Sequence, residues 1–240
     1  MKLPAVANAD QDLAVNEMFG PTFQGEGPSC GRLARFIRLF GCHLSCTWCD
    51  TPYTHDATRY DLGTEHRITT TEDILVWLAT GPPGLVVITG GEPLLQPRAL
   101  AHVTKAIQDA SLATDIEIET SGTIAPAVDL TDTVTRFNVS PKLAHSGLGH
   151  QQRIRSAVLS EFAATGKAVF KFVVQQVGDL DEISDLVTAH NLDPVWVMPE
   201  GTDSTIILTR MRQLANPVLA RGWHLSTRLH ILLWENTRAR

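Results

Sequence analysis

Short apolar runs alternate with longer segments of helical periodicity along most of this chain. The predicted strands are 33–40, 85–89, 115–120, 134–140, 168–175 and 195–198, the predicted helices are 69–80, 97–111, 151–165, 179–190 and 204–221, and residues 223–230 close the series. Strands that alternate with helices predict βαβ units, with a parallel sheet and helices outside it. A length of 240 residues fits one α/β domain. We divide the chain into an N-terminal lead-in, residues 1–15, and a single core domain, residues 16–240.

Five short segments directly follow predicted strands. They are GCHLSCTWCDT at 41–51, GGEP at 90–93, TSGT at 120–123, SPK at 140–142 and MPEG at 198–201. Ligands of α/β proteins bind at the carboxyl ends of the parallel strands, where such segments meet. The order of elements therefore predicts one shared active-site mouth.

Three of the four cysteines lie in the first of these segments. Cys42, Cys46 and Cys49 are separated by three residues and then by two. Three thiolates on one loop can converge on a metal site, but a structural zinc ion or an iron–sulfur cube takes four ligands. This loop leaves one position open, and an open position is where a metal centre can bind and activate another molecule.

Another residue could also complete the site. A structural zinc ion would take Cys30, His43 or His55 as its fourth ligand. Structural zinc sites usually draw their ligands from two separate pairs, whereas these three cysteines share one loop. Cys30 would also complete an all-cysteine cube, but it lies well upstream, in the turn GPSCG. The single loop therefore disfavours structural zinc, while the residues alone leave a fourth ligand from Cys30 open.

The spacing Cys-x3-Cys-x2-Cys, with Trp48 before the last cysteine, resembles the cluster loop of the radical S-adenosylmethionine superfamily. The segment from Glu17 to Thr51, EMFGPTFQGEGPSCGRLARFIRLFGCHLSCTWCDT, resembles one member of it, the 7-carboxy-7-deazaguanine synthase family. The likeness continues through ITGGEP, ETSGT, SPK and MPEG and so covers nearly the whole chain. It implies an incomplete parallel barrel of the (β/α)6 type, formed by a single domain.

The resemblance also implies cofactors. Cys42, Cys46 and Cys49 would hold a 4Fe–4S cluster, and the amine and carboxylate of S-adenosyl-L-methionine would bind its fourth iron. Further contacts to S-adenosyl-L-methionine are implied for Gly91, Glu92, Ser140, Pro141, Lys142, Met198, Pro199, Glu200 and Gly201. Without the resemblance, GGEP is an ordinary glycine turn and Lys142 an ordinary solvated charge. Thr51 matches a magnesium ligand, which suits the preference of Mg²⁺ for oxygen, and Asp50 could support it.

A third set of residues matches the substrate contacts of the family. They are Phe23, Gln24, Gly25, Arg38, Thr89 and His230. Arg38 has apolar neighbours in its predicted strand, and a buried arginine needs an anionic partner. Its planar fork suits a substrate carboxylate, and the alternative is an internal salt bridge to a residue such as Glu26. His230 fits a core-packing histidine equally well, and we expect Arg238 and Arg240 to lie in solvent.

The implied reaction converts 6-carboxy-5,6,7,8-tetrahydropterin to 7-carboxy-7-deazaguanine with loss of ammonia, in queuosine-type 7-deazapurine biosynthesis. The chemistry would be carried by the cluster and a 5′-deoxyadenosyl radical, with no catalytic side chain, and S-adenosylmethionine would be regenerated. The resemblance further implies a homodimer and an electron donor such as flavodoxin or ferredoxin.

Charge and composition limit the kinds of partner and compartment that the chain can have. A net charge of −6 leaves no global basic surface for nucleic acid. No apolar run approaches the length of a membrane-spanning helix. The N-terminal residues carry acids and lack a long apolar stretch, so we expect no signal peptide. Clustered cysteines fit a metal site in the reducing cytoplasm better than they fit a disulfide framework.

Two other functions fit part of this pattern. A glycyl-radical-enzyme activase would share the cysteine loop but act on a protein, whereas FQGEG and Arg38 suit a small carboxylated substrate. A non-enzymatic zinc-binding module would be colourless, whereas an iron–sulfur protein is brown.

Overall fold

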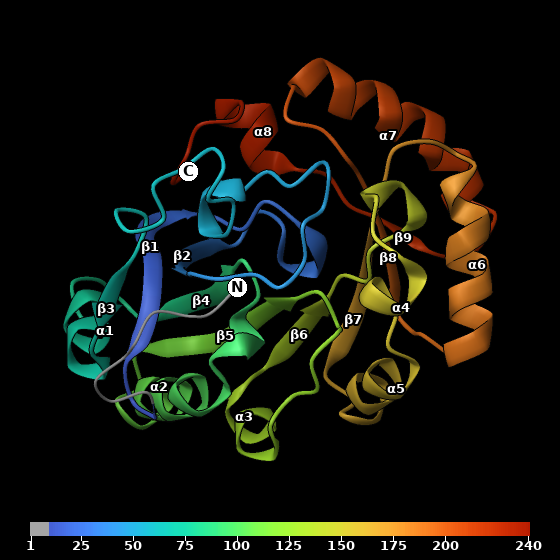
Figure 1. Ribbon diagram of the computed structural model, residues 1–240. Helices are drawn as coiled ribbons and strands as arrows, with labels where there is room; N and C mark the ends of the chain where they lie inside the picture. Colours follow the sequence, from blue (N-terminus) through green and yellow to red (C-terminus); the bar gives the residue numbers. More distant parts are fainter. Residues whose placement is uncertain (1–9) are drawn as a thin grey trace.

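The computed structural model describes residues 10–240 and contains one twisted sheet of nine strands (Figure 1). The strands are β1 (Leu13–Phe23), β2 (Leu33–Leu39), β3 (Arg67–Thr69), β4 (Gly84–Gly90), β5 (Ala113–Thr120), β6 (Arg136–Val139), β7 (Ala168–Val174), β8 (Val195–Pro199) and β9 (His224–Leu225). Their order in the sheet is β3-β1-β2-β4-β5-β6-β7-β8-β9, and the end strands β3 and β9 do not pair with each other. The barrel is therefore incomplete, as the sequence predicted.

Neighbouring strands from β2 to β9 pair in parallel. The six predicted strands correspond to β2, β4, β5, β6, β7 and β8, and their ends agree within two residues. Strands β1 and β3 are antiparallel additions at one edge. The amide of Gln96 helps to hold this edge, because its oxygen accepts from the Ala14 N–H at 2.7 Å and its nitrogen donates to the Phe40 carbonyl at 3.2 Å.

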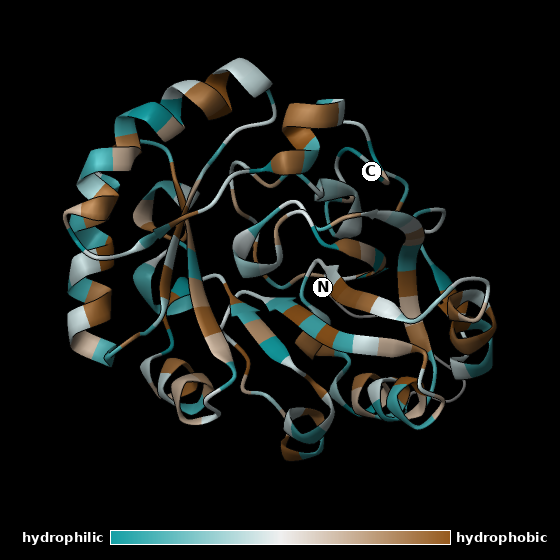
Figure 2. Ribbon diagram, turned by 180° about the vertical axis from the view of Figure 1, so that it is seen from behind, coloured by the Kyte–Doolittle hydropathy of each residue, from teal (hydrophilic) through white to brown (hydrophobic). Residues whose placement is uncertain are grey.

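Most of the helices lie outside the strands. They are α1 (Thr71–Leu78), α2 (Pro97–Asp109), α3 (Val128–Thr133), α4 (His150–Arg153), α5 (Ser156–Ala164), α6 (Asp179–His190), α7 (Ser204–Leu219) and α8 (Leu229–Trp234). Figure 1 shows α2, α3, α5, α6 and α7 as an arc around the sheet, with α8 apart from it. Figure 2 shows apolar stretches along the strands and apolar and polar residues mixed on the helices. The main core lies between the two layers and includes Ile37, Ile88, Ile118, Phe137 and Phe172.

Several element boundaries differ from prediction. Strand β1 begins at Leu13, inside the predicted lead-in of residues 1–15, while residues 1–9 lie outside the described range. The predicted helix over 151–165 is wrong as a single element, because Ile154 and Arg155 are extended between α4 and α5. The segment 223–230 holds only the two-residue strand β9 and the beginning of α8.

Among residues 10–240, every helix falls short of the length and apolarity that crossing a lipid bilayer requires.

Replacing Phe137 with alanine should test the layer between sheet and helices. The ring is fully buried and meets Phe162 edge to face, with ring centroids 5.3 Å apart. Truncation leaves a cavity, so we expect the free energy of unfolding to fall by about 3–5 kcal/mol. Urea unfolding of matched preparations measures this change. Val128→Ala, at a side chain that is 78% exposed, should change stability by less than about 0.5 kcal/mol.

Candidate active site

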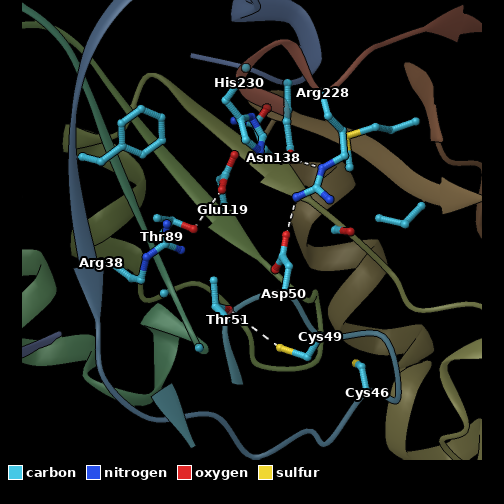
Figure 3. A pocket seen from close by; sticks show the side chains of 18 of the residues that line it. Arg38, Cys46, Cys49, Asp50, Thr51, Thr89, Glu119, Asn138, Arg228 and His230 are labelled. Atoms are coloured by element: carbon cyan, nitrogen blue, oxygen red, sulfur yellow. Dashed lines mark hydrogen bonds and ion pairs between the residues drawn. The ribbon is translucent and has the colours of Figure 1, made fainter. Parts of the chain in front are cut away.

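A pocket opens at the carboxyl ends of the parallel strands (Figure 3). Fifteen residues predicted from the sequence line it: Phe23, Gln24, Gly25, Arg38, Cys42, Cys46, Cys49, Thr51, Thr89, Gly91, Ser140, Lys142, Met198, Glu200 and His230. Four others lie close by but outside the lining: Glu92, Pro141, Pro199 and Gly201. The structure therefore brings the three predicted residue sets, for cluster, cofactor and substrate, to one cavity.

The cysteine loop is fixed by the glycines that end β4. The Gly91 N–H donates to the Leu39 carbonyl at 3.1 Å, and the Glu92 N–H donates to the Gly41 carbonyl at 2.7 Å. A Cβ on Gly91 would overlap the Gly41 carbonyl and approach the Cys42 Cβ to 2.8 Å. Gly90 has φ +144, a conformation that side chains disfavour. The two glycines thus let the loop after β4 lie directly against the start of the cysteine loop.

The three thiols are suited to a metal group rather than to solvent. Burial raises the pKa of Cys42 to about 12 and also raises the pKa of Cys46 and Cys49. The thiols are therefore protonated at neutral pH until a metal replaces the protons. Within residues 10–240, no three His, Cys, Asp or Glu side chains lie close enough together to share a single ion. Three soft thiols on one loop suit an iron–sulfur cluster, in which each thiolate binds a different iron, better than they suit a single ion.

Of the other candidate ligands for zinc, Cys30 and His43 have hydrogen-bond partners away from the three thiols, and His55 shares the pocket with them. The Cys30 thiol donates to the Gly25 carbonyl at 3.4 Å and does not line the pocket. His43 makes a 2.7 Å hydrogen bond with the Thr123 hydroxyl on the outer side of the loop. His55 lines the pocket, and its neighbour Thr54 contacts its Nδ1 at 3.2 Å.

Glu92 does not offer a free carboxylate to a ligand. The side chain is fully buried, and its oxygens accept from the Leu94 N–H, the Thr120 hydroxyl, and both the N–H and the hydroxyl of Ser121. The contact of Glu92 with S-adenosyl-L-methionine, which the resemblance implied, stays a prediction. Glu92 instead ties the loop after β4 to the end of β5, and so holds Gly91 in the pocket wall.

Arg38 forms an internal salt bridge, but with a different acid from the one considered above. Its Nε donates to Glu17 at 2.7 Å, and the Tyr53 hydroxyl donates to the same oxygen at 3.3 Å. Burial alone would lower the pKa of Arg38, but Tyr53 and Glu17 raise it overall. Because Glu17 engages only Nε, the terminal nitrogens of the fork stay available on a guanidinium that remains charged.

A second ionic network crosses the pocket and involves residues that the sequence did not single out. Lys171 on β7 contacts Glu26 at 2.5 Å and Glu119 at 3.6 Å. Arg228, just before α8, contacts Glu26 at 3.2 Å and also pairs with Asp50. The two cations are almost fully buried, so Glu26 and its neighbours must be charged to compensate them.

The protonation states of this network follow from its contacts. Burial would raise the pKa of Glu26, but Lys171 and Arg228 hold it well below its usual range. Burial likewise opposes the charge of Lys171, and the carboxylates of Glu119 and Glu26 raise its pKa above the ordinary value. For Asp50, the pull of Arg228 outweighs burial and lowers the pKa. The pocket wall is thus a set of fixed charges at neutral pH.

Glu119 presents its carboxylate to the pocket from the end of β5. It accepts from the Thr89 hydroxyl at 2.8 Å and from the Gln24 amide at 3.4 Å (Figure 3). Beside it, His230 packs directly on Gly25, where a Cβ would collide with the imidazole ring. Burial lowers the pKa of His230, so the ring is favoured in its neutral form. His230 therefore lies in the pocket and not in the apolar core.

Two further predicted segments frame the far side of the pocket. Lys142 donates to the Ser140 hydroxyl at 3.0 Å, and its ammonium lies 5.7 Å from the centre of the Trp48 ring. This placement beside the cysteine loop is not that of an ordinary solvated lysine. Glu200 pairs with Arg210 on α7, which fixes the Met198–Gly201 turn against that helix.

The C-terminal residues reach the pocket, which corrects the expectation for Arg238. This side chain is 44% exposed, yet it contacts Glu17 at 3.1 Å and Glu65 at 2.9 Å. Its guanidinium also lies 3.9 Å from the centre of the Tyr53 ring. Residues 236–240 line the pocket mouth, so the chain end covers the side on which Arg38 lies.

The residues that sequence reasoning missed carried signals of different strength. Lys171 is a charged residue inside an otherwise apolar strand, Glu119 is the last of three acids in DIEIET, and Arg228 precedes the predicted His230 by two residues. A charge in a strand covered on both faces has to be paired or has to face a cavity. Applied to AVFKFVV, that rule identifies Lys171 as a residue that needs a partner or a cavity, whereas in DIEIET it does not separate Glu119 from Asp115 and Glu117.

Known proteins are similar to this chain in sequence and in fold. The sequence model of the radical SAM superfamily matches residues 36–163. The 7-carboxy-7-deazaguanine synthase of Pyrobaculum aerophilum is 33% identical over 236 residues, which cover 97% of this chain and 100% of that protein. The 7-carboxy-7-deazaguanine synthase of Bacillus cereus is 37% identical over 198 residues, 80% of this chain and 78% of that one.

Solved structures agree with these relatives. The crystal structure of QueE from Escherichia coli superposes with a TM-score of 0.71 at 29% identity and covers 91% of this chain and 95% of that chain. Streptococcus suis SuiB, bound to its precursor peptide SuiA, has a TM-score of 0.57 at 15% identity, over 82% of this chain and 49% of its own. The second likeness is one of fold alone.

The Glu26 network should make stability depend on pH. The pKa of Glu26 is held below its ordinary 4.5 in the folded protein, so its contribution is present above that pH and is lost as the pH falls. Glu26→Gln leaves two buried cations without their shared partner, and we expect a loss of roughly 3–5 kcal/mol at pH 7. The difference between variant and wild type should shrink below about pH 4.5.

Urea unfolding at pH 7 and at acid pH measures this difference. Glu161→Gln, at an exposed position on α5, is the control and should have little effect at either pH. A difference for Glu26→Gln that stays constant down to strongly acid pH would contradict the linkage.

Proposed function

Because the chain belongs to the 7-carboxy-7-deazaguanine synthase family of radical S-adenosylmethionine enzymes, we propose that it converts 6-carboxy-5,6,7,8-tetrahydropterin to 7-carboxy-7-deazaguanine with loss of ammonia. The observation that carries this proposal is the pocket itself. Three thiols, the arginine fork of Arg38 and the carboxylate of Glu119 line one cavity at the carboxyl ends of the strands. The enzyme would act in 7-deazapurine biosynthesis of the queuosine type.

Membership of the radical SAM superfamily implies a 4Fe–4S cluster and S-adenosylmethionine. We assign the cluster to Cys42, Cys46 and Cys49, whose loop is held between Thr54 and the glycines after β4. When bound, the cluster and S-adenosylmethionine supply a 5′-deoxyadenosyl radical. The chain itself positions the reacting groups and keeps water away from them.

For S-adenosylmethionine we propose contacts in three segments. The backbone of Gly91 lies directly against the start of the cysteine loop, and Lys142, which donates to Ser140, lies near Trp48 in the same loop. Met198 and Glu200 line the same cavity from the end of β8. In this assignment Glu92, Pro141, Pro199 and Gly201 support the backbone of their segments and do not line the cavity.

For the substrate we propose that Arg38 binds the carboxylate. Its Nε is occupied by Glu17, which orients the terminal nitrogens, and a fork of two N–H groups matches a carboxylate. Glu119, Thr89 and Gln24 offer acceptors and donors suited to the amine and amide edge of a pterin. Phe23, Gly25 and His230 complete this end of the pocket, and residues 236–240 narrow its mouth.

A narrowed mouth also bears on the rival function. A glycyl-radical-enzyme activase must admit a segment of another protein, whereas here the chain end and Arg238 occupy the side of the pocket near Arg38. A small substrate is the one that this arrangement favours.

We propose magnesium at Thr51, between the cysteine loop and the substrate residues. The Thr51 hydroxyl lies 3.7 Å from the Cys49 sulfur and is a weak ligand alone, so substrate oxygens would complete the site. Asp50 is held by Arg228 and would support the site without being a direct ligand.

The proposals for an electron donor, a cellular compartment and a homodimer are based on chemistry and on the resemblance. His43, Ser45 and Thr47 are exposed on the outer side of the cysteine loop, which would let an electron donor such as flavodoxin or ferredoxin come close to the cluster. All four cysteines are free thiols, which supports a reducing compartment such as the cytoplasm. The homodimer rests on the resemblance alone.

Anaerobic reconstitution with iron and sulfide tests the function and its ligands together. With S-adenosylmethionine, a reductant and the carboxytetrahydropterin, the wild-type protein should form 7-carboxy-7-deazaguanine. Alanine at any one of Cys42, Cys46 or Cys49 should remove the cluster and the product, because each would hold one iron.

Cys30→Ala is the matched control, since this thiol contacts only the Gly25 carbonyl and lies outside the pocket. Iron content and electron paramagnetic resonance of the reduced protein report the cluster independently of activity. Loss of the cluster in Cys30→Ala would overturn the ligand assignment, and a loaded wild type that forms no product would overturn the function.

Magnesium should be needed mainly in the substrate complex. After chelator treatment, we expect activity to depend on added Mg²⁺, and Thr51→Ala should require a higher Mg²⁺ concentration with an unchanged iron content. Thr47→Ala, on the exposed side of the same loop, is the control and should keep the wild-type requirement. Full activity of the wild type without any divalent ion would end this assignment.

A further inference from the structure

Arg228 has an unusual set of contacts, because each nitrogen of its guanidinium serves a different segment. Nε donates to the Glu26 carboxylate at 3.2 Å, and Nη1 donates to the Gly201 carbonyl at 2.6 Å. Nη2 donates to the carboxylate of Asp50, as Figure 3 shows. The three partners belong to residues 23–27, called the substrate segment below, to the Met198–Gly201 turn and to the cysteine loop, which lie far apart in the sequence.

The chemistry of these contacts requires arginine. The side chain is only 8% exposed, so water cannot replace a partner that is lost. A guanidinium directs five N–H groups in a fixed plane, whereas the ammonium of lysine is a single nitrogen on a flexible stem. Lysine at this position would keep the positive charge beside Glu26 and Asp50 but could not reach three segments at once.

No other residue of the described chain combines these contacts with a place in the pocket wall. Lys171 shares Glu26 but reaches neither the cysteine loop nor the Met198–Gly201 turn through a contact of its own. Residues beside Arg228 also contact the substrate segment: the Leu229 N–H donates to the Gly25 carbonyl, and the Gly27 N–H donates to the Ser226 hydroxyl. The segment that carries Arg228 is thus already docked on the substrate segment.

We infer that Arg228 is a positioning residue that fixes the cysteine loop, the Met198–Gly201 turn and the substrate segment relative to one another. This inference deepens the proposed function and rests on it for its catalytic consequence. A reaction started by a radical depends on the distance between the substrate carbon and the cofactor. Arg228 sets that distance by holding the parts of the chain that contact each of them.

Two kinds of variant test the inference. Arg228→Gln removes the charge and most of the fork, and Arg228→Lys keeps the charge but removes the three-way geometry. Arg221 is the matched control, because its guanidinium also serves three partners, Ser184, Pro217 and Asp181, on α6 and α7 outside the pocket. Arg221→Gln and Arg221→Lys should therefore loosen only the outer helices.

Hydrogen–deuterium exchange of the reconstituted proteins gives a readout that does not need the reaction. In both Arg228 variants, amide exchange should rise together in peptides that cover residues 23–27, 46–54 and 198–203, while iron content stays at the wild-type level. In the Arg221 variants these three peptides should exchange as in the wild type. If Arg228→Gln does not fold, Arg228→Lys carries the comparison.

The second readout is the amount of 5′-deoxyadenosine released for each product molecule. A misplaced substrate lets the radical end without product, so both Arg228 variants should lose product formation on the order of 100-fold and raise this ratio by about tenfold or more. A role in stability alone would lower both products in parallel and leave the ratio unchanged.

The outcomes separate a failure of the inference about Arg228 from a failure of the proposed function. Unchanged exchange, or a rise confined to one of the three peptides, would overturn the inference, and so would a wild-type ratio in Arg228→Lys. If the wild-type enzyme makes no 7-carboxy-7-deazaguanine, the proposed function fails, and the exchange data alone then decide whether Arg228 ties the three segments.

Discussion

The charge on Glu26 has to be compensated inside the pocket, and that requirement links distant parts of the chain. Its carboxylate is shared by Lys171, in the middle of β7, and Arg228, which follows β9. Leaving any of these charges buried and unpaired would cost several kcal/mol. The last part of the chain must therefore return to the mouth of the barrel, where Arg228 meets the residues that follow β1. The site and the closing of the fold depend on the same ionic contacts.

The parallel strands could be predicted because helices cover one face and the barrel interior covers the other, so each strand is a short apolar run bounded by turn residues. Strand β1 escaped this reasoning. It is antiparallel, its register with β2 is interrupted twice, and it contains Gly20 and Pro21. Its place at the sheet edge depends on pairing with β2 and on the distant Gln96 side chain, which no local pattern reveals.

Site residues could be predicted where they stand in a motif of fixed spacing. They could not be predicted where their role depends on a partner from a distant part of the chain. The cysteines and the glycines after β4 stand in short motifs, and the structure brings them together as those motifs indicated. The partners of Arg38 and Glu92 could not be chosen from sequence, because Glu17 and Ser121 lie on other elements. Arg238 was expected in solvent, because nothing in the sequence shows that the chain end folds back onto Tyr53.

The positions of charge across the sheet define the polarity of any ligand. Arg38 on β2 is in register with Thr89 on β4, and the Thr89 hydroxyl bonds to Glu119 on β5. The cation and the anion therefore stand two strands apart in one layer, with their backbones roughly 10 Å from each other. A flat bicyclic molecule with an acid at one end and an amine edge at the other satisfies both charges in a single orientation. A ligand carboxylate placed beside Glu119 would meet a like charge, so this layer disfavours the reverse orientation.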